Sequence, residues 1–221
     1  KKGDKVLIIS TGVFGSNWGK MADKMGINTI YLEYGMEDSL DFDDLEKMIS
    51  NDPKQEIKGI LTVQTDTASS ILTDVKKVRR VLDEHKHSAL FLVDSIACFG
   101  CDEMHMDEWG IDVLLTASQK GLMAPPGLSY LVINDKAEEN AKEITEKSAY
   151  WDWGPRLDPS KFYEIYCGTA PTHLLFAQKA ALDIIKKEGK DNIIKRHLIL
   201  AKTVWKAIEI WKQEGPLNFN V

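Results

Sequence analysis

The sequence predicts an α/β protein with a mostly parallel sheet that is covered on both faces by helices. Short, continuously apolar segments alternate with helical segments along most of the chain, and such strands are typical of parallel sheets. Glycine or polar turns follow several of these strands, as βα units require. The 221 residues and the 43% hydrophobic content are sufficient for one sizeable core.

Six segments have the composition of strands. The first, at 5–10, leads through a glycine loop to a helix expected over 17–25, whose apolar residues recur at helical spacing. Acidic residues open the segment 41–50, as the first turn of a helix favours. The other expected strands are 29–32, 57–63, 89–93, 111–116 and 129–133, and the other expected helices are 71–82, 135–146, 171–187 and 192–213.

Composition and charge limit the possible partners. The net charge of −6 argues against a nucleic-acid partner, because binding to phosphate backbones needs clustered Lys and Arg. No apolar run approaches the roughly 20 residues that span a bilayer, so we expect no membrane partner. Residues 1–5 lead into a strand rather than into the apolar region of a signal peptide. Three cysteines are too few for a disulfide framework, which indicates a reducing, cytoplasmic location.

Cys98 and Cys101 are spaced like half of a redox or metal site. The alternative is that two small residues fill a tight loop. No second cysteine pair or histidine pair stands at metal-ligand spacing, so the sequence favours packing, and we expect no metal site.

The strongest functional signal is a lysine and an aspartate at the ends of neighbouring strands. Lys120 lies in the turn after the apolar run 111–116, and Asp94 ends the run 89–93. Either residue alone is more often structural or solvated, but ligands bind open α/β sheets at these strand ends. The pairing suits pyridoxal 5'-phosphate, since a lysine forms an imine with its aldehyde and an aspartate keeps its ring nitrogen protonated. That chemistry needs a free amine, which desolvation favours.

Other motifs have two readings each. Backbone N–H groups in the loop 11–15 can hold a phosphate at a helix N-terminus, or the loop is a plain turn; it lacks the third glycine of the dinucleotide fingerprint. Phe14 either stacks on a cofactor ring or belongs to the core. Thr67 either bonds a ring oxygen or caps the next helix, and Thr169 either caps a helix or contacts a phosphate. Arg156 either binds a carboxylate or forms a loop salt bridge.

Taken together, the motifs resemble those of class V aminotransferases, most closely the alanine–glyoxylate and serine–glyoxylate group. The resemblance runs from about residue 2 to about residue 212. It implies the large domain of fold-type I enzymes, a mostly parallel seven-stranded sheet in three α/β/α layers. It also implies a cofactor-binding domain over 1–190, without the family's N-terminal segment, and a helix over 191–221 that leads toward a small domain outside the chain. The motifs that carry it are 93–97, 110–113, 118–127 and 166–171.

The resemblance also implies roles for residues. Lys120 would form the Schiff base and then carry a proton between substrate and cofactor, and Asp94 would pair with the pyridine nitrogen. Phe14 would stack on the ring, and Thr67 would contact its phenolic oxygen. The phosphate would be held in a homodimer whose active site is shared across the interface. Its expected contacts are Gly12, Val13, Phe14, Gly15 and Gln119 from one subunit, with Tyr166 and Thr169 from the other.

The implied activity is a ping-pong transamination through aldimine and ketimine forms. An amino group would pass from a small amino acid, serine or alanine, to a 2-oxo acid, glyoxylate or pyruvate. The alternatives are a lyase or desulfurase on the same scaffold, or a catalytically silent fragment that serves as a dimerisation scaffold. Two departures from the family bear on the site: residues 64–67 replace its His-Gly-Glu-Ser-like turn, and residues 166–169 replace its Tyr-His-His-Thr. The family's arginine for the substrate carboxylate lies outside this sequence.

Overall fold

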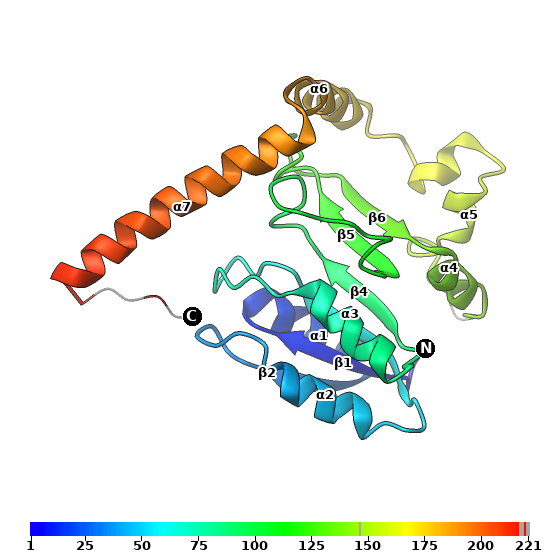
Figure 1. Cartoon of the computed structure of the whole chain (residues 1–221). Helices are drawn as coiled ribbons and strands as arrows, with labels where there is room; N and C mark the ends of the chain where they lie inside the picture. The colour runs from blue at the N-terminus through cyan, green and yellow to red at the C-terminus, as the bar shows by residue number, and fades with distance from the viewer. Residues whose placement is uncertain (146, 217–218, 220–221) are drawn as a thin grey trace.

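The computed structural model describes residues 1–145, 147–216 and 219, and its centre is a six-stranded sheet (Figure 1). The strands are ordered β2-β1-β3-β4-β5-β6, with β1 to β5 parallel and β6 antiparallel to β5. The predicted α/β fold with a mostly parallel sheet is therefore confirmed. The bounds are β1 Lys5–Ser10, β2 Asn28–Glu33, β3 Ile57–Val63, β4 Leu90–Asp94, β5 Val113–Ala117 and β6 Ser129–Ile133.

The number of strands differs from the expectation that came with the family resemblance. The described residues contribute six strands, whereas seven were expected. All six lie close to the segments that the apolar runs predicted, because each run is long enough for one buried strand and ends at a turn.

Helices cover both faces of the sheet, which gives the three layers that were predicted. The side chains of Leu7 and Ile9 belong to a core cluster shared with α2 and α3, whereas Val6 and Ile8 pack with Ala22 of α1. Successive strand residues face opposite sides, so a strand buried on both sides must be apolar throughout. These helices are α1 Val13–Lys24, α2 Phe42–Ser50 and α3 Val75–Glu84.

Helix α3 begins later than the sequence pattern indicated. The expected helix was 71–82, but Leu72 forms an antiparallel bridge with Thr65. The Asp74 side chain then caps the first turn by accepting a hydrogen bond from a backbone N–H. Hydrophobic periodicity cannot tell whether an apolar residue lies in the first turn of a helix or pairs with another segment just before it. The start of α3 was therefore set by tertiary contacts and could not be predicted from the pattern.

The second half of the chain is mainly helical. The expected helix 135–146 is observed as α4, Asp135–Lys142, and its expected last residue, Glu146, lies outside the described residues. The short helix α5 begins within the aromatic segment 150–156. The remaining elements are α5 Gly154–Leu157, the 3-10 segment η1 Phe162–Tyr166, α6 Thr172–Glu188 and α7 Lys190–Glu214.

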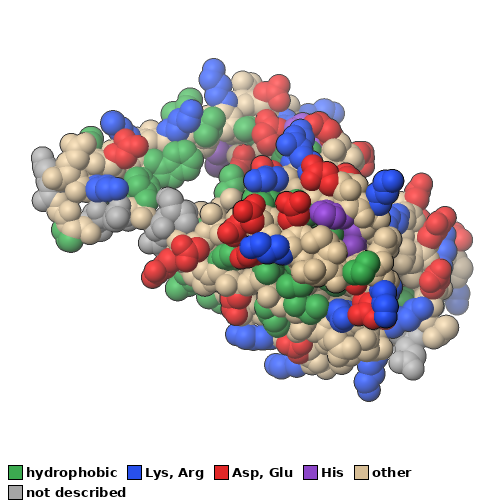
Figure 2. Space-filling model, turned by 60° about the horizontal axis from the view of Figure 1, so that its bottom comes forward, with side chains coloured by type: hydrophobic (Ala, Val, Ile, Leu, Met, Phe, Trp, Pro, Cys, Tyr) green, Lys and Arg blue, Asp and Glu red, His purple; other side chains and the backbone are tan. Residues whose placement is uncertain are grey.

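Helix α7 extends away from the sheet as a long arm (Figure 1). Figure 2 shows hydrophobic side chains on this arm, and large apolar residues on it are about half exposed, among them Val204, Trp205 and Trp211. The division into a domain over 1–190 and a connecting helix over 191–221 remains a prediction, and residues 217–218 and 220–221 lie outside the described part. Within that part, no helix has the length and apolar character needed to cross a bilayer.

Beside β3, buried His87 pairs with the largely buried Asp52, and this pair is expected to link stability to pH. Burial raises the pKa of Asp52, but hydrogen bonds from the backbone of Ile57 and Glu56 and from His87 outweigh it, so the pKa is lowered overall. The His87 Nε2 lies 3.2 Å from the Asp52 carboxylate. A carboxylate whose pKa is lowered on folding contributes stability above its ordinary pKa, and this stability is lost as the pH falls through the lowered value.

We therefore expect Asp52→Asn to lower the unfolding free energy by about 1–3 kcal/mol at pH 7, because charged hydrogen bonds are weakened. The difference from the unchanged protein should shrink as the pH falls below about 4, near the ordinary carboxyl pKa. Urea unfolding of both proteins at pH 7 and at a pH below about 4 measures the difference in unfolding free energy. Asp44→Asn is the control, since the Asp44 side chain is 45% exposed and its contacts are long, 3.3 Å to Lys47 and 3.4 Å to the Tyr34 hydroxyl. A constant difference at both pH values would contradict the expectation.

Candidate active site

Buried polar side chains gather at one edge of the sheet, where β1, β3, β4 and β5 end. Ser10 ends β1, Gln64 and Asp66 follow β3, Ser95 follows β4 and Ser118 follows β5, and each is at most 3% exposed. The Ser95 hydroxyl donates to Gln64 Oε1 at 2.7 Å, which ties two of the loops together. The carboxyl ends of parallel strands therefore converge on a polar edge, the usual position of ligand sites in open α/β sheets.

Asp94 is the last residue of β4 and lies at this edge. Burial raises its pKa, the Ile96 backbone amide opposes the rise, and the nearby charge of Asp66 adds to it. The Ile96 N–H donates to Oδ1 of Asp94 at 2.8 Å. Across residues 1–145, 147–216 and 219, no cationic side chain pairs with the Asp94 carboxylate. A partly desolvated carboxylate without a cation is well suited to pair with a positively charged ligand atom.

Lys120 lies in the turn after β5, and buried Ser118 organises this turn. The Ser118 hydroxyl donates to the backbone oxygen of Pro125 at 2.7 Å and accepts from the Leu128 N–H at 3.3 Å. On the other side, Gln178 of α6 donates to the Leu122 carbonyl at 3.1 Å. The path of the chain around Lys120 is therefore set from both ends.

Close packing joins the lysine turn to the loop after β4. A Cβ atom added at Gly121 would collide with the Phe99 carbonyl oxygen, and one added at Gly100 would lie 3.3 Å from the Gly121 oxygen. Gly100 also has φ of +83°, which favours glycine. One of these loops follows Asp94, and the other contains Lys120. Their contact therefore holds the loop after the acid against the turn that carries the amine.

Lys120 itself is exposed, which differs from the desolvated environment expected from its chemistry. Its amine has no hydrogen bond or ion pair with any other described residue. The side chain is thus available to react, but this chain alone does not shield it from water. Gln119, expected to contact a phosphate, is also exposed.

The glycine loop after β1 is occupied by a carboxylate from the same chain. Oδ2 of Asp66 accepts hydrogen bonds from the backbone N–H groups of Phe14 at 2.9 Å and Gly15 at 3.0 Å. These amides were expected to hold the cofactor's phosphate, and in this structure Asp66 accepts from both of them; their phosphate role remains a prediction. The expected roles of Gly12 and Val13 remain predictions. The sequence analysis missed Asp66; an acid in the turn after β3 was its only local signal.

For Phe14 and Thr67, the structure rules out one of the two alternatives. Phe14 is 50% exposed at the start of α1, so the interpretation as a core aromatic is wrong. Thr67 is exposed and does not cap the next helix, since Asp74 is the N-cap of α3. The stacking role of Phe14 and the ring contact of Thr67 stay predictions.

Tyr166 and Thr169 lie together on the segment that leads from η1 into α6. Tyr166 is partly buried and Thr169 is exposed. Thr169 does not cap α6, because Pro171 is the N-cap and no side chain caps that end. Arg156 forms no loop salt bridge among the described residues; it donates to the Asp152 carbonyl at 2.7 Å and stacks over the Tyr150 ring.

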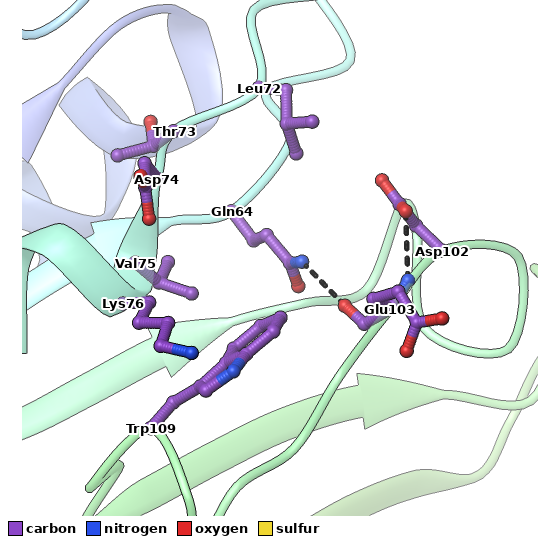
Figure 3. A pocket seen from close by; sticks show the side chains of 9 residues that line it. All are labelled: Gln64, Leu72, Thr73, Asp74, Val75, Lys76, Asp102, Glu103 and Trp109. Atoms are coloured by element: carbon purple, nitrogen blue, oxygen red, sulfur yellow. Dashed lines mark hydrogen bonds between the residues drawn. The ribbon is translucent and has the colours of Figure 1, made fainter.

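A separate cavity of about 360 Å³ lies beside the start of α3 (Figure 3). In Figure 3, the Trp109 indole lies below Gln64, whose amide donates to the Glu103 carbonyl at 3.1 Å. None of the predicted cofactor residues lines this cavity, so we do not assign it to the cofactor. Its lining residues are Gln64, Leu72, Thr73, Asp74, Val75, Lys76, Asp102, Glu103 and Trp109.

Cys98 and Cys101 have the surroundings of packing residues, whereas Cys167 is exposed. Cys98 is 7% exposed, and burial raises its thiol pKa, as it does for the partly buried Cys101. A reactive cysteine needs a lowered pKa, so neither thiol has the environment that a desulfurase nucleophile requires.

The fold and the site together define an α/β protein with a partly buried acid and an exposed amine at the carboxyl edge of its sheet. The chain belongs to the class-V aminotransferase family, whose model matches residues 1–214.

Known proteins resemble the chain throughout the matched region. It is 35% identical over 212 residues to serine–glyoxylate aminotransferase of Arabidopsis thaliana. It is 33% identical over 211 residues to L-aspartate–glyoxylate aminotransferase of Paracoccus denitrificans. Each alignment covers 95% of this chain and 52% of the relative. The crystal structure of alanine–glyoxylate aminotransferase from Nostoc sp. superposes with a TM-score of 0.84 at 26% identity, covering 95% of this chain and 55% of that one. The chain thus spans about half the length of these relatives.

Proposed function

We propose that the protein is a pyridoxal-phosphate-dependent transaminase that transfers an amino group from a small amino acid to a 2-oxo acid. The observation that carries this proposal is the Asp94 carboxylate. It is partly buried, lacks a cation among the described residues and ends the strand next to the one that leads to Lys120. An uncompensated carboxylate at this position is stabilised if a protonated pyridine nitrogen binds beside it.

The residues at the edge of the sheet fit the cofactor in three respects. Asp94 supplies an anion for the ring nitrogen. Phe14 supplies a half-exposed aromatic face at the start of α1, where a ring can stack. Lys120 supplies an amine that makes no competing hydrogen bond with another described residue. When bound, the cofactor supplies an aldehyde that bonds to amines and a ring that accepts electrons.

Each residue has a distinct task in the transfer. Lys120 takes a proton from the Cα atom of the amino acid and returns one in the second half of the reaction. Asp94 keeps a positive charge on the ring nitrogen by placing a negative charge beside it. Phe14 fixes the plane of the ring, and the Ser118 hydroxyl holds the turn that presents the lysine.

Serine or alanine as donor, and glyoxylate or pyruvate as acceptor, are the substrates that we propose. Support comes from the relatives, since those with 35% and 33% identity are named as serine–glyoxylate and L-aspartate–glyoxylate aminotransferases. We also propose a cytoplasmic homodimer in which Tyr166 and Thr169 of one subunit reach the phosphate of the other. The exposure of Thr169 and of Gln119 leaves both side chains accessible for such contacts.

Trapping with borohydride tests the proposal directly. After incubation with pyridoxal phosphate, we expect an absorbance band within about 330–430 nm and, after reduction, a covalent adduct on the peptide that contains Lys120. The peptide with Lys179, an exposed lysine paired with Asp183 on α6, is the internal control. A colourless protein, or equal labelling of the two peptides, would overturn the proposal.

A further inference from the structure

We propose that Asp66 is a positioning residue whose carboxylate occupies the anion-binding position at the N-terminus of α1. In this role, the loop after β1 orients Phe14 and does not bind the phosphate of the cofactor. The inference rests on the proposed function for its link to the cofactor, but the geometry of the carboxylate is independent of it.

The Asp66 carboxylate is bound like a ligand. It is fully buried and accepts backbone hydrogen bonds on both oxygens. Oδ2 accepts from Phe14 and Gly15, and Oδ1 accepts from Ala68 at 3.0 Å. Gly12 leaves the space for it, because a Cβ atom there would lie 2.5 Å from Oδ1 of Asp66. The backbone of Gly12 is extended, with φ of 171°, so it is this close approach that requires glycine.

A helix N-terminus that already holds a carboxylate is a poor site for a second anion. The free N–H groups and the helix dipole attract negative charge there. Asp66 satisfies the two amides that point into the loop, and a phosphate placed on the same amides would face a full negative charge at contact distance. The loop therefore has the geometry of a phosphate cradle, but its occupant is a side chain from the β3–α3 connection.

Asp66 acts on the site through Phe14. The amide of Phe14 is one of the groups that Asp66 binds, so the carboxylate fixes the backbone of the residue that carries the exposed ring. No other aromatic ring contacts Phe14 in the part of the chain that the structure describes. Asp66 also lies close enough to Asp94 to raise the pKa of that carboxyl, which places two negative charges near the proposed ring nitrogen.

The first test asks whether the position is an anion site. We expect Asp66→Ala to lower Tm by about 5–10 °C, because several charged hydrogen bonds are lost, and we expect added formate or inorganic phosphate to restore part of this loss. Asp41→Ala is the matched control, since Asp41 also caps a helix, α2, but is exposed. Added formate should change neither the Tm of this control nor that of the unchanged protein. Equal behaviour of the two alanine variants would overturn the proposal.

The second test separates positioning from phosphate binding. Asp66→Asn keeps the volume of the side chain but removes its charge. Positioning of Phe14 predicts that this variant binds pyridoxal phosphate and pyridoxal more weakly by the same factor, about 3–10-fold, as expected for a disturbed stacking contact. Asp66→Glu should recover part of the affinity. If the ratio of the two affinities changes instead, the loop binds the phosphate and the proposal is wrong.

The two proposals can fail separately. If the unchanged protein binds neither form of the cofactor, the proposed function fails, whereas the recovery of Asp66→Ala by formate still supports the anion position. If the cofactor binds to Lys120 but formate does not raise the Tm of Asp66→Ala, the proposed role of Asp66 is wrong while the proposed function stands.

Discussion

Lys120→Ala is expected to reduce the transamination rate by at least about 10²–10⁴-fold, the range that a positioned proton-transfer group contributes. The variant loses both the amine that bonds the cofactor and the base that takes the substrate's proton. Its Tm should remain close to that of the unchanged protein, because Lys120 is exposed and forms no hydrogen bond with another described residue. Steady-state kinetics and thermal unfolding measure the two effects.

A conservative variant and a control sharpen this test. Lys120→Arg keeps the positive charge but cannot form the imine, so it should be as inactive as the alanine variant. Lys179→Ala removes an exposed lysine of α6 and should retain full activity. If Lys120→Arg were active, or if Lys120→Ala lost activity only by unfolding, Lys120 would not be the reacting amine.

Asp94→Asn is expected to lower the rate by about 10²–10³-fold while leaving the cofactor-free protein at least as stable. The asparagine oxygen can still accept from the Ile96 N–H, but it cannot hold a positive charge on the ring nitrogen. Burial raises the pKa of Asp94 on folding. Below the ordinary carboxyl pKa, Asp94 is protonated in both the folded and the unfolded state and costs no stability. As the pH rises toward and through the raised pKa, the ionised carboxylate destabilises the folded protein. The substitution removes that cost at neutral pH.

A second buried aspartate provides the contrast. Asp112 is 3% exposed and is fully paired: its carboxylate accepts from the Phe91 N–H at 2.8 Å, from Asn134 at 2.9 Å and from Lys136 at 3.1 Å. Asp112→Asn should therefore destabilise the protein, since it leaves a charged partner uncompensated. Unfolding of both variants without cofactor, at pH 5 and pH 8, measures the difference. If Asp94→Asn destabilised the protein as much as Asp112→Asn, Asp94 would be a structural residue.

Much of this arrangement could be read from the order of residues. Most residues of the buried strands are apolar, because both faces of these strands are covered. The positions of Asp94 and Lys120 after two such runs place them at the same edge, since parallel strands end on the same side of a sheet. Local chemistry also marked the first turn of α2, where Asp41 accepts from the Asp43 N–H.

Contacts between distant segments account for what the pattern did not reveal. Helix α1 was expected to begin at residue 17, but it begins at Val13, because Asp66 satisfies the amides of its first turn from 51 and 52 residues away. The same contact binds the backbone amide of Phe14. The fit of Gly121 against the Phe99 carbonyl joins two loops that the sequence shows only as separate turns.

The sequence by itself determined the alternation of strands and helices, and with it the edge at which both the acid and the amine lie. These features depend on hydrophobic periodicity and on the direction of parallel strands, and both are properties of neighbouring residues. Only the tertiary structure decided that Asp66 occupies the helix N-terminus, that Phe14 faces outward and that Asp94 lacks a cation within the described residues. These features depend on which groups share a buried space, and that is settled when segments far apart in the chain pack together.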